Sequence, residues 1–227
     1  ETLGNWRKRI VFVADDGDAN THQLQADRLG RFIEANYEQF NTNRIFVDAF
    51  PQVVSTNTGK RFSPAARAEI EKNIENGVLI MNFTGLGAET GWTSEDILTN
   101  GQVVNWQNKY KMPMFLTATC EFGRYDNPTL KSGAELAMLN ANGGAIALLT
   151  TTRPVFSNTN LEVNEAFYNA AFQEINGKMP RLGDILVKTK NNSITGVINR
   201  NFALLGDPSM RLAYPEDDIV ITAVKNR

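Results

Sequence analysis

The sequence of 227 residues lacks features that mark several classes of protein. Its single cysteine, Cys120, cannot form a disulfide within the chain and leaves the cellular compartment open. No apolar run approaches the ~18 residues of a membrane-spanning helix, so we expect no transmembrane segment. The net charge of −2 and the absence of a basic block argue against a nucleic-acid partner.

Other absences concern ligands and domain boundaries. No P-loop or dinucleotide glycine pattern is present, so a nucleotide-binding domain is disfavoured, and no cofactor or metal is expected. Without an internal repeat or low-complexity tract, residues 1–227 are expected to form a single domain. The chain begins with Glu1 and has no signal peptide, so we expect a domain excised from a larger multidomain protein. Residues 219–222 are expected to start a following strand-rich module.

Short apolar runs alternate with helical spacing along the chain. Strands are expected at residues 10–14, 44–48, 78–83, 113–118, 145–150 and 202–205. Helices are expected at residues 21–40, 64–76, 102–110, 130–139, 161–175 and 182–190, with a short additional helix beginning at Glu95. This alternation is typical of βαβ units. It predicts an α/β protein with a parallel sheet of about six strands and helices on both faces.

Three interior strands end in polar or glycine-bracketed segments. These segments are Gly85-Leu86-Gly87, Thr119-Cys120-Glu121 and Thr151-Thr152-Arg153. In open α/β sheets, ligands and catalytic groups gather just beyond the carboxyl ends of the strands. We therefore expect the three segments to form one rim on which Cys120 is displayed as a nucleophile. The alternative is that Cys120 is a small buried hydrophobe, as free cysteines commonly are.

The first strand ends in the acidic loop Asp15-Asp16-Gly17-Asp18. A solvated N-terminal helix cap is the favoured interpretation of this loop. Orientation of catalytic groups, or binding of a cation such as calcium, are the alternatives. The only histidine, His22, follows in the first helix. It is expected to be partly exposed on the helix face, although a place on the rim stays open.

Several segments resemble gingipain-type cysteine peptidases. Residues 82–92, Asn-Phe-Thr-Gly-Leu-Gly-Ala-Glu-Thr-Gly-Trp, resemble the histidine loop of that family, and residues 117–126 resemble its nucleophile segment. Residues 143–154 and 202–208 are most similar to one branch, the PorU-type sortases and signal peptidases of the type IX secretion system. The resemblance implies a caspase-like three-layer fold, a Cys–His dyad and cleavage of peptide bonds.

One position departs from the family pattern. The family carries histidine between the two glycines, where this sequence has Leu86. Attack by cysteine needs a thiolate, which a neighbouring histidine generates, and leucine cannot exchange the proton. We therefore expect this chain to be inactive by the usual route. It is either a natural pseudopeptidase that binds substrate or serves as a scaffold, or an enzyme silenced by an engineered Leu86.

The resemblance also implies roles for other residues and for the whole protein. The backbone N–H groups of Cys120 and Gly87 would form an oxyanion hole. Substrate contacts are expected from Trp92, Glu121, Thr152 and Arg153, with Tyr125 as a second wall of the groove. Burial of Trp92 and a surface ion pair of Arg153 are the alternatives. The substrates would be secreted proteins with C-terminal sorting domains, cleaved through a Cys120 thioester. Other secretion-system components would be partners, at the cell surface, outer membrane or outside the cell.

Overall fold

A six-stranded sheet forms the centre of the computed structural model, which describes residues 4–57 and 59–215. Its strand order is β11-β10-β9-β5-β1-β2. The strands are β1 (Arg9–Ala14), β2 (Asn41–Phe46), β5 (Ile80–Thr84), β9 (Met114–Ala118), β10 (Ala147–Thr151) and β11 (Phe202–Leu205). All neighbours pair in parallel except β11, which runs antiparallel to β10. The predicted mainly parallel sheet is confirmed, whereas residues 219–222 lie outside the described residues.

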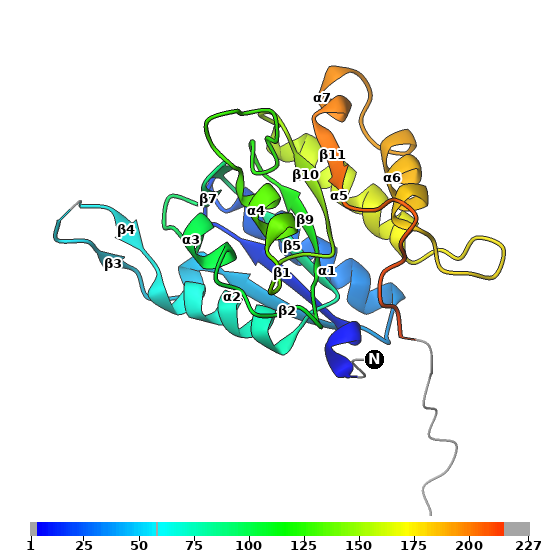
Figure 1. The fold of residues 1–227 in the computed structure, drawn as a ribbon, viewed down its shortest axis with the longest axis horizontal. Coiled ribbons are helices and arrows are strands. Elements are labelled where there is room, and N and C mark those ends of the chain that lie inside the picture. Colours follow the sequence, from blue (N-terminus) through cyan, green and yellow to red (C-terminus); the bar gives the residue numbers. More distant parts are fainter. Residues whose placement is uncertain (1–3, 58, 216–227) are drawn as a thin grey trace, which may run out of the picture.

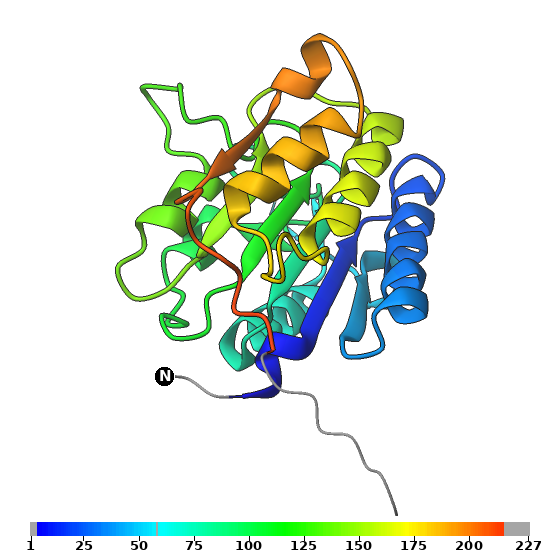
Figure 2. The same cartoon turned by 90° about the vertical axis from the view of Figure 1, so that its right-hand side faces the viewer.

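Helices cover both faces of this sheet. The helices are α1 (Thr21–Asn36), α2 (Pro64–Asn76), α3 (Asn100–Val103), α4 (Gly133–Leu139), α5 (Ser157–Ala171), α6 (Leu182–Asn191) and α7 (Val197–Arg200). Figure 1 shows α2, α3 and α4 on one side of the sheet and α1, α5 and α6 on the other, and Figure 2 views the second layer from its own side. The molecule therefore has three layers, as the sequence predicted.

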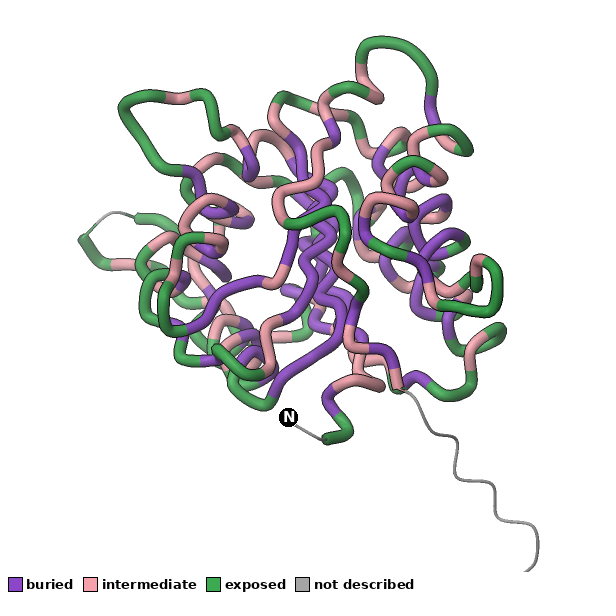
Figure 3. The backbone as a smooth tube through the Cα atoms, turned by 45° about the vertical axis from the view of Figure 1, so that its right-hand side comes forward, coloured by how far each residue is buried: buried purple, intermediate pink, exposed green. Residues whose placement is uncertain are grey.

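Alternation along β1 explains why the central strands read as continuous apolar runs. Ile10 and Phe12 point into the cluster that packs under α1, α5 and α6, whereas Val11 and Val13 point into the cluster under α2, α3 and α4. A parallel strand with helices on both faces has no side that faces water. All four side chains are accordingly fully buried, and Figure 3 shows the buried backbone concentrated at the centre of the fold.

Local signals place several helix starts. Ser63 is the N-cap of α2, where its Oγ accepts a hydrogen bond from Ala66 N at 3.4 Å. Ser132 and Glu135 form a capping box at the start of α4. Side-chain caps of this kind satisfy N–H groups that have no partner within the helix. The Ser63 cap confirms the helix start predicted from the sequence.

The chain between β5 and β9 differs from prediction. The helix expected from Glu95 is a turn in which Thr93 and Asp96 have φ of 61° and 50°. The helix expected at 102–110 is only the single turn of α3. Instead, β6 (Gly87–Ala88), β7 (Gly91–Trp92) and β8 (Leu98–Thr99) form a small antiparallel sheet. Positive φ at Thr93 and Asp96 is incompatible with the helix expected from Glu95. The helix expected at 102–110 was also wrong, because α3 ends at Val103.

The chain between β2 and α2 contains a hairpin. Its strands are β3 (Val53–Val54) and β4 (Arg61–Phe62), which pair antiparallel. Figure 1 shows this hairpin projecting from the body of the molecule. The described chain also has two short 3₁₀ turns, Asn5–Lys8 and Val47–Ala49, at the start of β1 and the end of β2.

Candidate active site

Four neighbouring strands end at one edge of the sheet. Thr84, the last residue of β5, pairs with Ala14 of β1 on one side and with Ala118 of β9 on the other. Parallel β10 continues the same edge beyond β9. Because the carboxyl ends of parallel strands coincide, the segments containing Leu86, Cys120 and Thr152 follow one another along a single rim. The predicted rim is present in the structure.

Cys120 lies in a sharp turn directly after β9. Its side chain is half-buried, and its Sγ lies 3.8 Å from the carbonyl oxygen of Val155. The next residue, Glu121, has φ of 56°, a left-handed conformation that non-glycine residues seldom adopt. The turn presents the thiol at the rim instead of burying it as a core hydrophobe.

Polar side chains brace the segment that leads into this turn. Asn160 Nδ2, from the first turns of α5, donates to Ala118 O at 3.1 Å. Thr151 Oγ1, at the end of β10, donates to Thr119 O. These bonds tie the end of β9 to the helix layer on one side and to β10 on the other, so the position of Cys120 is fixed by long-range contacts.

The loop after β5 carries Leu86 beside the cysteine turn. The Leu86 side chain is 51% exposed. Its backbone N–H donates to Asp15 Oδ2 at 2.6 Å, and its carbonyl oxygen accepts from Thr93 N at 2.8 Å. A Cβ on Gly87 would lie 2.5 Å from Thr119 Oγ1. Only glycine permits this approach, so the loop packs directly against the residue that precedes Cys120.

Two backbone N–H groups, those of Gly87 and Cys120, are predicted to form an oxyanion hole. Because Thr93 N bonds to Leu86 O, Gly87 and Trp92 form a non-hydrogen-bonded pair of the β6–β7 ladder. The Gly87 N–H therefore points away from β7. Within residues 4–57 and 59–215, no acceptor is found for the N–H of Cys120. Free N–H groups of this kind stabilise the oxyanion of a tetrahedral intermediate.

Asp15 and His22 form a buried pair, which corrects two expectations. Asp15 is 2% exposed and His22 is 3% exposed, so neither is solvated or on an open helix face. His22 Nδ1 contacts Asp15 Oδ1, and His22 Nε2 lies 3.3 Å from Asp18 Oδ2. Both ring nitrogens are engaged by carboxylates. In this structure the only histidine of the chain is therefore bound by carboxylates at both ring nitrogens.

The acidic loop does not provide a cation site. Asp16 and Asp18 are exposed, whereas both oxygens of Asp15 already accept hydrogen bonds, from His22 and Gly17 on one side and from the Leu86 N–H on the other. Among the described residues, no group of three or more histidine, cysteine or acidic side chains is arranged to hold a metal ion. The orienting role is the alternative that these contacts favour.

The two aromatic residues predicted to wall a groove differ in exposure. Trp92 is fully buried and stacks on Phe83, with ring centroids 4.3 Å apart and planes within 4°. It belongs to the core between the small sheet and the main sheet, so the expectation that it contacts substrate is corrected. Tyr125, in the segment after Cys120, is 56% exposed.

The charged residues of the rim are paired with one another. Arg153 binds Asp126 through both Nη atoms, at 3.0 and 2.5 Å, and the bond lowers the pKa of the Asp126 carboxyl. Glu121 Oε1 accepts from Arg124 Nη1 at 3.3 Å. Thr152 donates its N–H to Asn201 O at 2.8 Å and faces the segment before β11. In this structure these contacts join rim loops to one another, and a substrate would have to compete with the Arg153 pair.

A buried row of asparagines supports the rim from below, and sequence reasoning missed it. Asn82 Nδ2 donates to Asn164 Oδ1 at 2.8 Å and to Leu116 O at 3.0 Å. Asn164 Nδ2 donates to the backbone oxygen of Asn160 at 2.7 Å. The row connects β5, β9 and α5. The available signal was the polar Asn82 within an otherwise apolar strand.

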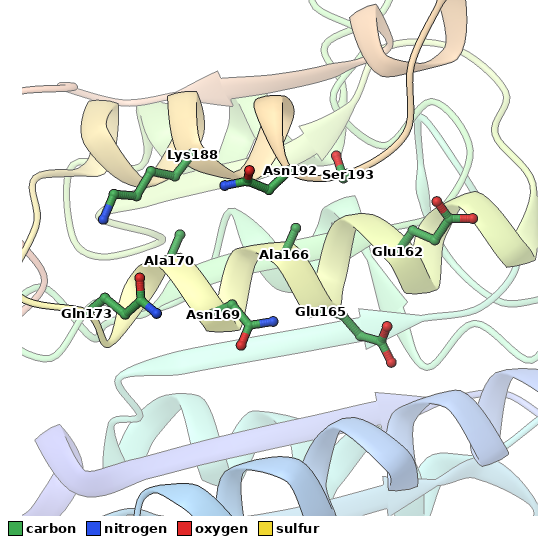
Figure 4. Close-up of a pocket in the computed structure, with 9 residues that line it drawn as sticks. All are labelled: Glu162, Glu165, Ala166, Asn169, Ala170, Gln173, Lys188, Asn192 and Ser193. Atoms are coloured by element: carbon green, nitrogen blue, oxygen red, sulfur yellow. The ribbon is translucent and has the colours of Figure 1, made fainter.

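A hollow of about 390 Å³ lies elsewhere, between α5 and α6. Its lining consists of Glu162, Glu165, Ala166, Asn169, Ala170, Gln173, Lys188, Asn192 and Ser193. Figure 4 shows Ala166 and Ala170 pointing from α5 toward α6, and Glu165 and Asn169 on the side of α5 away from it. None of the lining residues belongs to the rim. A smaller hollow of about 290 Å³ is lined by Leu86, Gly87 and the turns around β7, including Thr90 and Ser94. The second hollow adjoins the candidate site.

Comparisons with known proteins identify the relatives of this chain. A family model described as peptidase family C25 matches residues 1–213. No curated protein shows a significant match. The crystal structure of the Arg-specific cysteine proteinase gingipain R (RgpB) is 15% identical, with a TM-score of 0.71 over 92% of this chain and 48% of that one. A complex of the pro- and mature domains of RgpB from Porphyromonas gingivalis is 14% identical, with a TM-score of 0.71 over 92% of this chain and 49% of the other.

A more distant likeness is to the separase–securin complex of Saccharomyces cerevisiae, 10% identical with a TM-score of 0.58, covering 88% of this chain and 12% of that chain. At these identities the solved structures bear on the fold alone, and they confirm the caspase-like α/β fold. The chain spans about half the length of the gingipain structures it matches. No helix in the described part of the chain is long and apolar enough to cross a membrane.

Proposed function

Because the chain belongs to peptidase family C25, we propose that it is a gingipain-like peptidase domain that binds peptides at Cys120 but does not cleave them. One observation carries the proposal. Cys120 lies on the rim, while the position expected to hold the base is Leu86 and the only histidine is bound by two carboxylates.

The chemistry explains why binding and cleavage separate here. A thiolate attacks the peptide carbonyl, the N–H groups of Cys120 and Gly87 stabilise the oxyanion, and the leaving amine then needs a proton. Leu86 neither removes the thiol proton nor supplies one to the amine. The groove and the oxyanion donors do not depend on that proton transfer, so affinity for a peptide persists without turnover.

The substrate class follows from the similarity of residues 143–154 and 202–208 to PorU-type sortases. We propose that the bound segment belongs to the C-terminal sorting domains of secreted proteins, on the cell surface or outer membrane, with other secretion-system components as partners. With histidine at position 86, Cys120 would form a thioester to the cleaved protein and pass its acyl group to water or to another acceptor. Tyr125, Glu121, Thr152 and Arg153 are proposed to contact the peptide.

Leu86→His tests this assignment. Leu86 is already exposed, and its loop is held by Asp15 and packed on Thr119, so we expect an imidazole there to reach the thiol without a backbone change. We expect iodoacetamide to alkylate Cys120 faster at pH 6.5 in this variant, because an imidazolium favours the thiolate. We also expect alkylation of Cys120 by a peptide acyloxymethyl ketone, in which the thiolate displaces the carboxylate, to rise by ~10²–10⁴-fold, as general acid–base catalysis allows.

Two controls make the comparison specific. Leu139→His places histidine at another exposed leucine, at the end of α4 next to the opposite edge of the sheet, and should change neither rate. Adding Cys120→Ala to Leu86→His should abolish both gains. If folded Leu86→His gains in neither assay, the dyad assignment is wrong. A gain with iodoacetamide alone, and not with the peptide reagent, would support the dyad and contradict the proposed peptide groove.

Binding is measured separately on the unmodified chain. Titration calorimetry with an isolated C-terminal sorting domain should show binding without release of a cleaved product. Cys120→Ala should retain this affinity, because the thiol is not needed for binding in the proposal. Absence of binding would contradict the substrate class while leaving the dyad result intact.

A further inference from the structure

The carboxylate of Asp15 joins three segments at the rim. It follows β1, its Oδ1 accepts from Gly17 N at 3.1 Å and contacts His22 Nδ1, and its Oδ2 accepts from Leu86 N at 2.6 Å. The end of β1, the start of α1 and the loop after β5 are thus held by one side chain. Sequence separations of 7 and 71 residues make these contacts tertiary.

The surroundings leave this carboxylate no room to move. A Cβ on Gly85 would lie 2.7 Å from Asp15 Oδ2, and a Cβ on Gly17 would lie 3.2 Å from His22 Nδ1. Both loops therefore pack directly onto the buried pair. A change in the Asp15–His22 contact has to displace at least one of the two loops, because interiors packed at this density transmit small shifts.

The loop that closes over His22 has a strained backbone. Asp18, Ala19 and Asn20 have φ of 52°, 54° and 66°, three consecutive non-glycine residues in the left-handed region. Each such residue costs roughly 1–2 kcal/mol relative to right-handed backbone. Contacts that offset this cost are the approach of Asp18 Oδ2 to His22 Nε2, at 3.3 Å, and the bond from Thr21 Oγ1 to Asp18 O, at 2.6 Å.

We propose that Asp15, His22 and Asp18 form a proton-controlled latch that positions the Leu86 loop beside Cys120. Protonated His22 donates from Nδ1 to Asp15 and from Nε2 to Asp18. Nε2 faces the 60% exposed side chain of Asp18, so the proton on Nε2 is the one released to solvent, while Nδ1–H stays with the buried Asp15. The Nε2 lone pair then faces a carboxylate, and Asp18 with its strained loop separates from the ring.

The other charged side chains packed around α1 are paired with one another, so Asp15 and Asp18 are the charged groups that act on His22. Arg44 of β2 is bound to Asp27 and Glu34, and Glu165 of α5 is bound to Arg28. The adjoining strand β5 has no charged side chain. Burial by itself would lower the pKa of His22, but the hydrogen bond and charge of Asp15 and the charge of Asp18 outweigh burial and raise it above 6.5.

The raised pKa of His22 sets the pH range in which the latch is closed. A raised pKa means that the latch is fully closed below pH 6.5 and opens as the pH rises through the pKa of His22 in the folded protein. When Asp18 separates, the His22 ring loses one of its two carboxylate contacts, and the Asp15 carboxylate bonded to its other nitrogen shifts together with the Leu86 N–H that it holds. Because Gly87 packs on Thr119, the residue before Cys120, the position of the rim loop relative to the thiol becomes pH-dependent.

NMR of the unmodified chain tests the latch without peptide or turnover, so the result is independent of the proposed function. The only histidine gives one set of imidazole signals, which can be followed from pH 5 to pH 9 together with the Leu86 amide. We expect the imidazole to titrate with a midpoint above 6.5 and the Leu86 amide to shift with the same midpoint. A Leu86 amide that does not follow His22 would overturn the proposal, as would a midpoint at or below 6.5.

Two variants of the same loop provide a matched comparison. Asp18→Asn removes the charge that faces His22 Nε2, whereas Asp16→Asn removes an equal charge from an exposed neighbour that does not contact the ring. The His22 midpoint should fall in Asp18→Asn and stay near that of the unmodified chain in Asp16→Asn. Equal midpoints in the two variants would exclude Asp18 from the latch. If Asp18→Asn does not fold, the proposal is still tested by whether the His22 imidazole and the Leu86 amide titrate with the same midpoint in the unmodified chain.

Discussion

Tyr168 and Tyr214 approach the same ring, Phe172, but their hydroxyl groups have different surroundings. Their ring centroids lie 6.2 and 6.3 Å from that of Phe172. Tyr214 OH donates to Ala171 O at 2.6 Å, whereas the buried Tyr168 OH has no partner among the described residues. A buried hydroxyl without a partner opposes folding, while a bonded one stabilises the fold.

This difference predicts opposite effects of the same substitution. Tyr214→Phe should lower the free energy of unfolding by about 1 kcal/mol, because it leaves the Ala171 carbonyl without its donor. Tyr168→Phe should be neutral or stabilising. Urea unfolding of both variants measures the two changes, and each is the control for the other. A larger loss for Tyr168→Phe would mean that its hydroxyl has a buried partner, such as an ordered water.

At the residue scale, part of the candidate site could be predicted from the sequence and part could not. Cys120 and Leu86 were predictable because each lies in a local pattern directly after an apolar strand. The partnership of Asp15 with His22 and the Leu86 N–H was not, because it depends on contacts across 71 residues. An acidic loop read in isolation looks solvated. Only the fold shows that its first carboxylate lies beneath the loop after β5.

At the scale of elements, α5 supports the cysteine turn through Asn160. Asn160→Ala removes the bond to Ala118 O and should lower the free energy of unfolding by about 1–3 kcal/mol, because the site is buried. Asn169→Ala, on the exposed side of the same helix, is the matched control and should cost little. Thermal or urea unfolding compares them. Equal losses would show that the contact with β9 is not the source of the effect, because replacing asparagine by alanine by itself favours a helix.

Helices and strands were predictable where the apolar periodicity was strong and where capping or turn residues marked their ends. The central strands follow apolar runs and the helices α1, α2, α5 and α6 follow apolar repeats, and α2 is in addition bounded by the Ser63 cap and Gly77. The region from Thr93 to Tyr110 was misread, because its structure depends on two-residue strands and on left-handed turn residues. Such pieces are too short for periodicity to register, and their positive φ values involve residues other than glycine.

At the scale of the molecule, one sheet connects two hydrophobic clusters. The cluster under α2, α3 and α4 contains Trp92 and Trp106, and the cluster under α1, α5 and α6 contains Tyr168 and Tyr214. Because β1, β5, β9 and β10 contribute side chains to both clusters, loss of the sheet removes both at once. This supports the proposal that residues 1–227 form one domain.

A single cooperative transition is the expected consequence. Tryptophan fluorescence and far-UV circular dichroism should give the same midpoint in urea, because the tryptophan cluster and the helices of the other layer unfold together. The midpoint should not depend on protein concentration if the domain unfolds as a monomer. Two separated midpoints would contradict the single-domain proposal and would assign independent stability to one layer.

The acid side of the stability profile depends on a pair that fixes the edge strand β2 to α1. Arg44 Nη1 lies 2.7 Å from Glu34 Oε1, and its Nε lies 2.8 Å from Asp27 Oδ1. The hydrogen bonds from Arg44 and then from Thr42 lower the pKa of Glu34 to about 2. A lowered pKa contributes stability above the usual value of 4.5, and this contribution is lost as the pH falls from 4.5 towards 2.

Glu34→Gln should therefore flatten the fall in unfolding free energy between pH 5 and pH 2.5. It should also lower stability at pH 7, by less than a buried pair would, because the Glu34 side chain is 46% exposed and solvent screens the interaction. Glu38→Gln makes the same charge change at a neighbouring glutamate for which no ion pair is found in the described part of the chain. Urea unfolding at several pH values compares them. Parallel profiles for the two variants would mean that Arg44 does not hold Glu34 in solution.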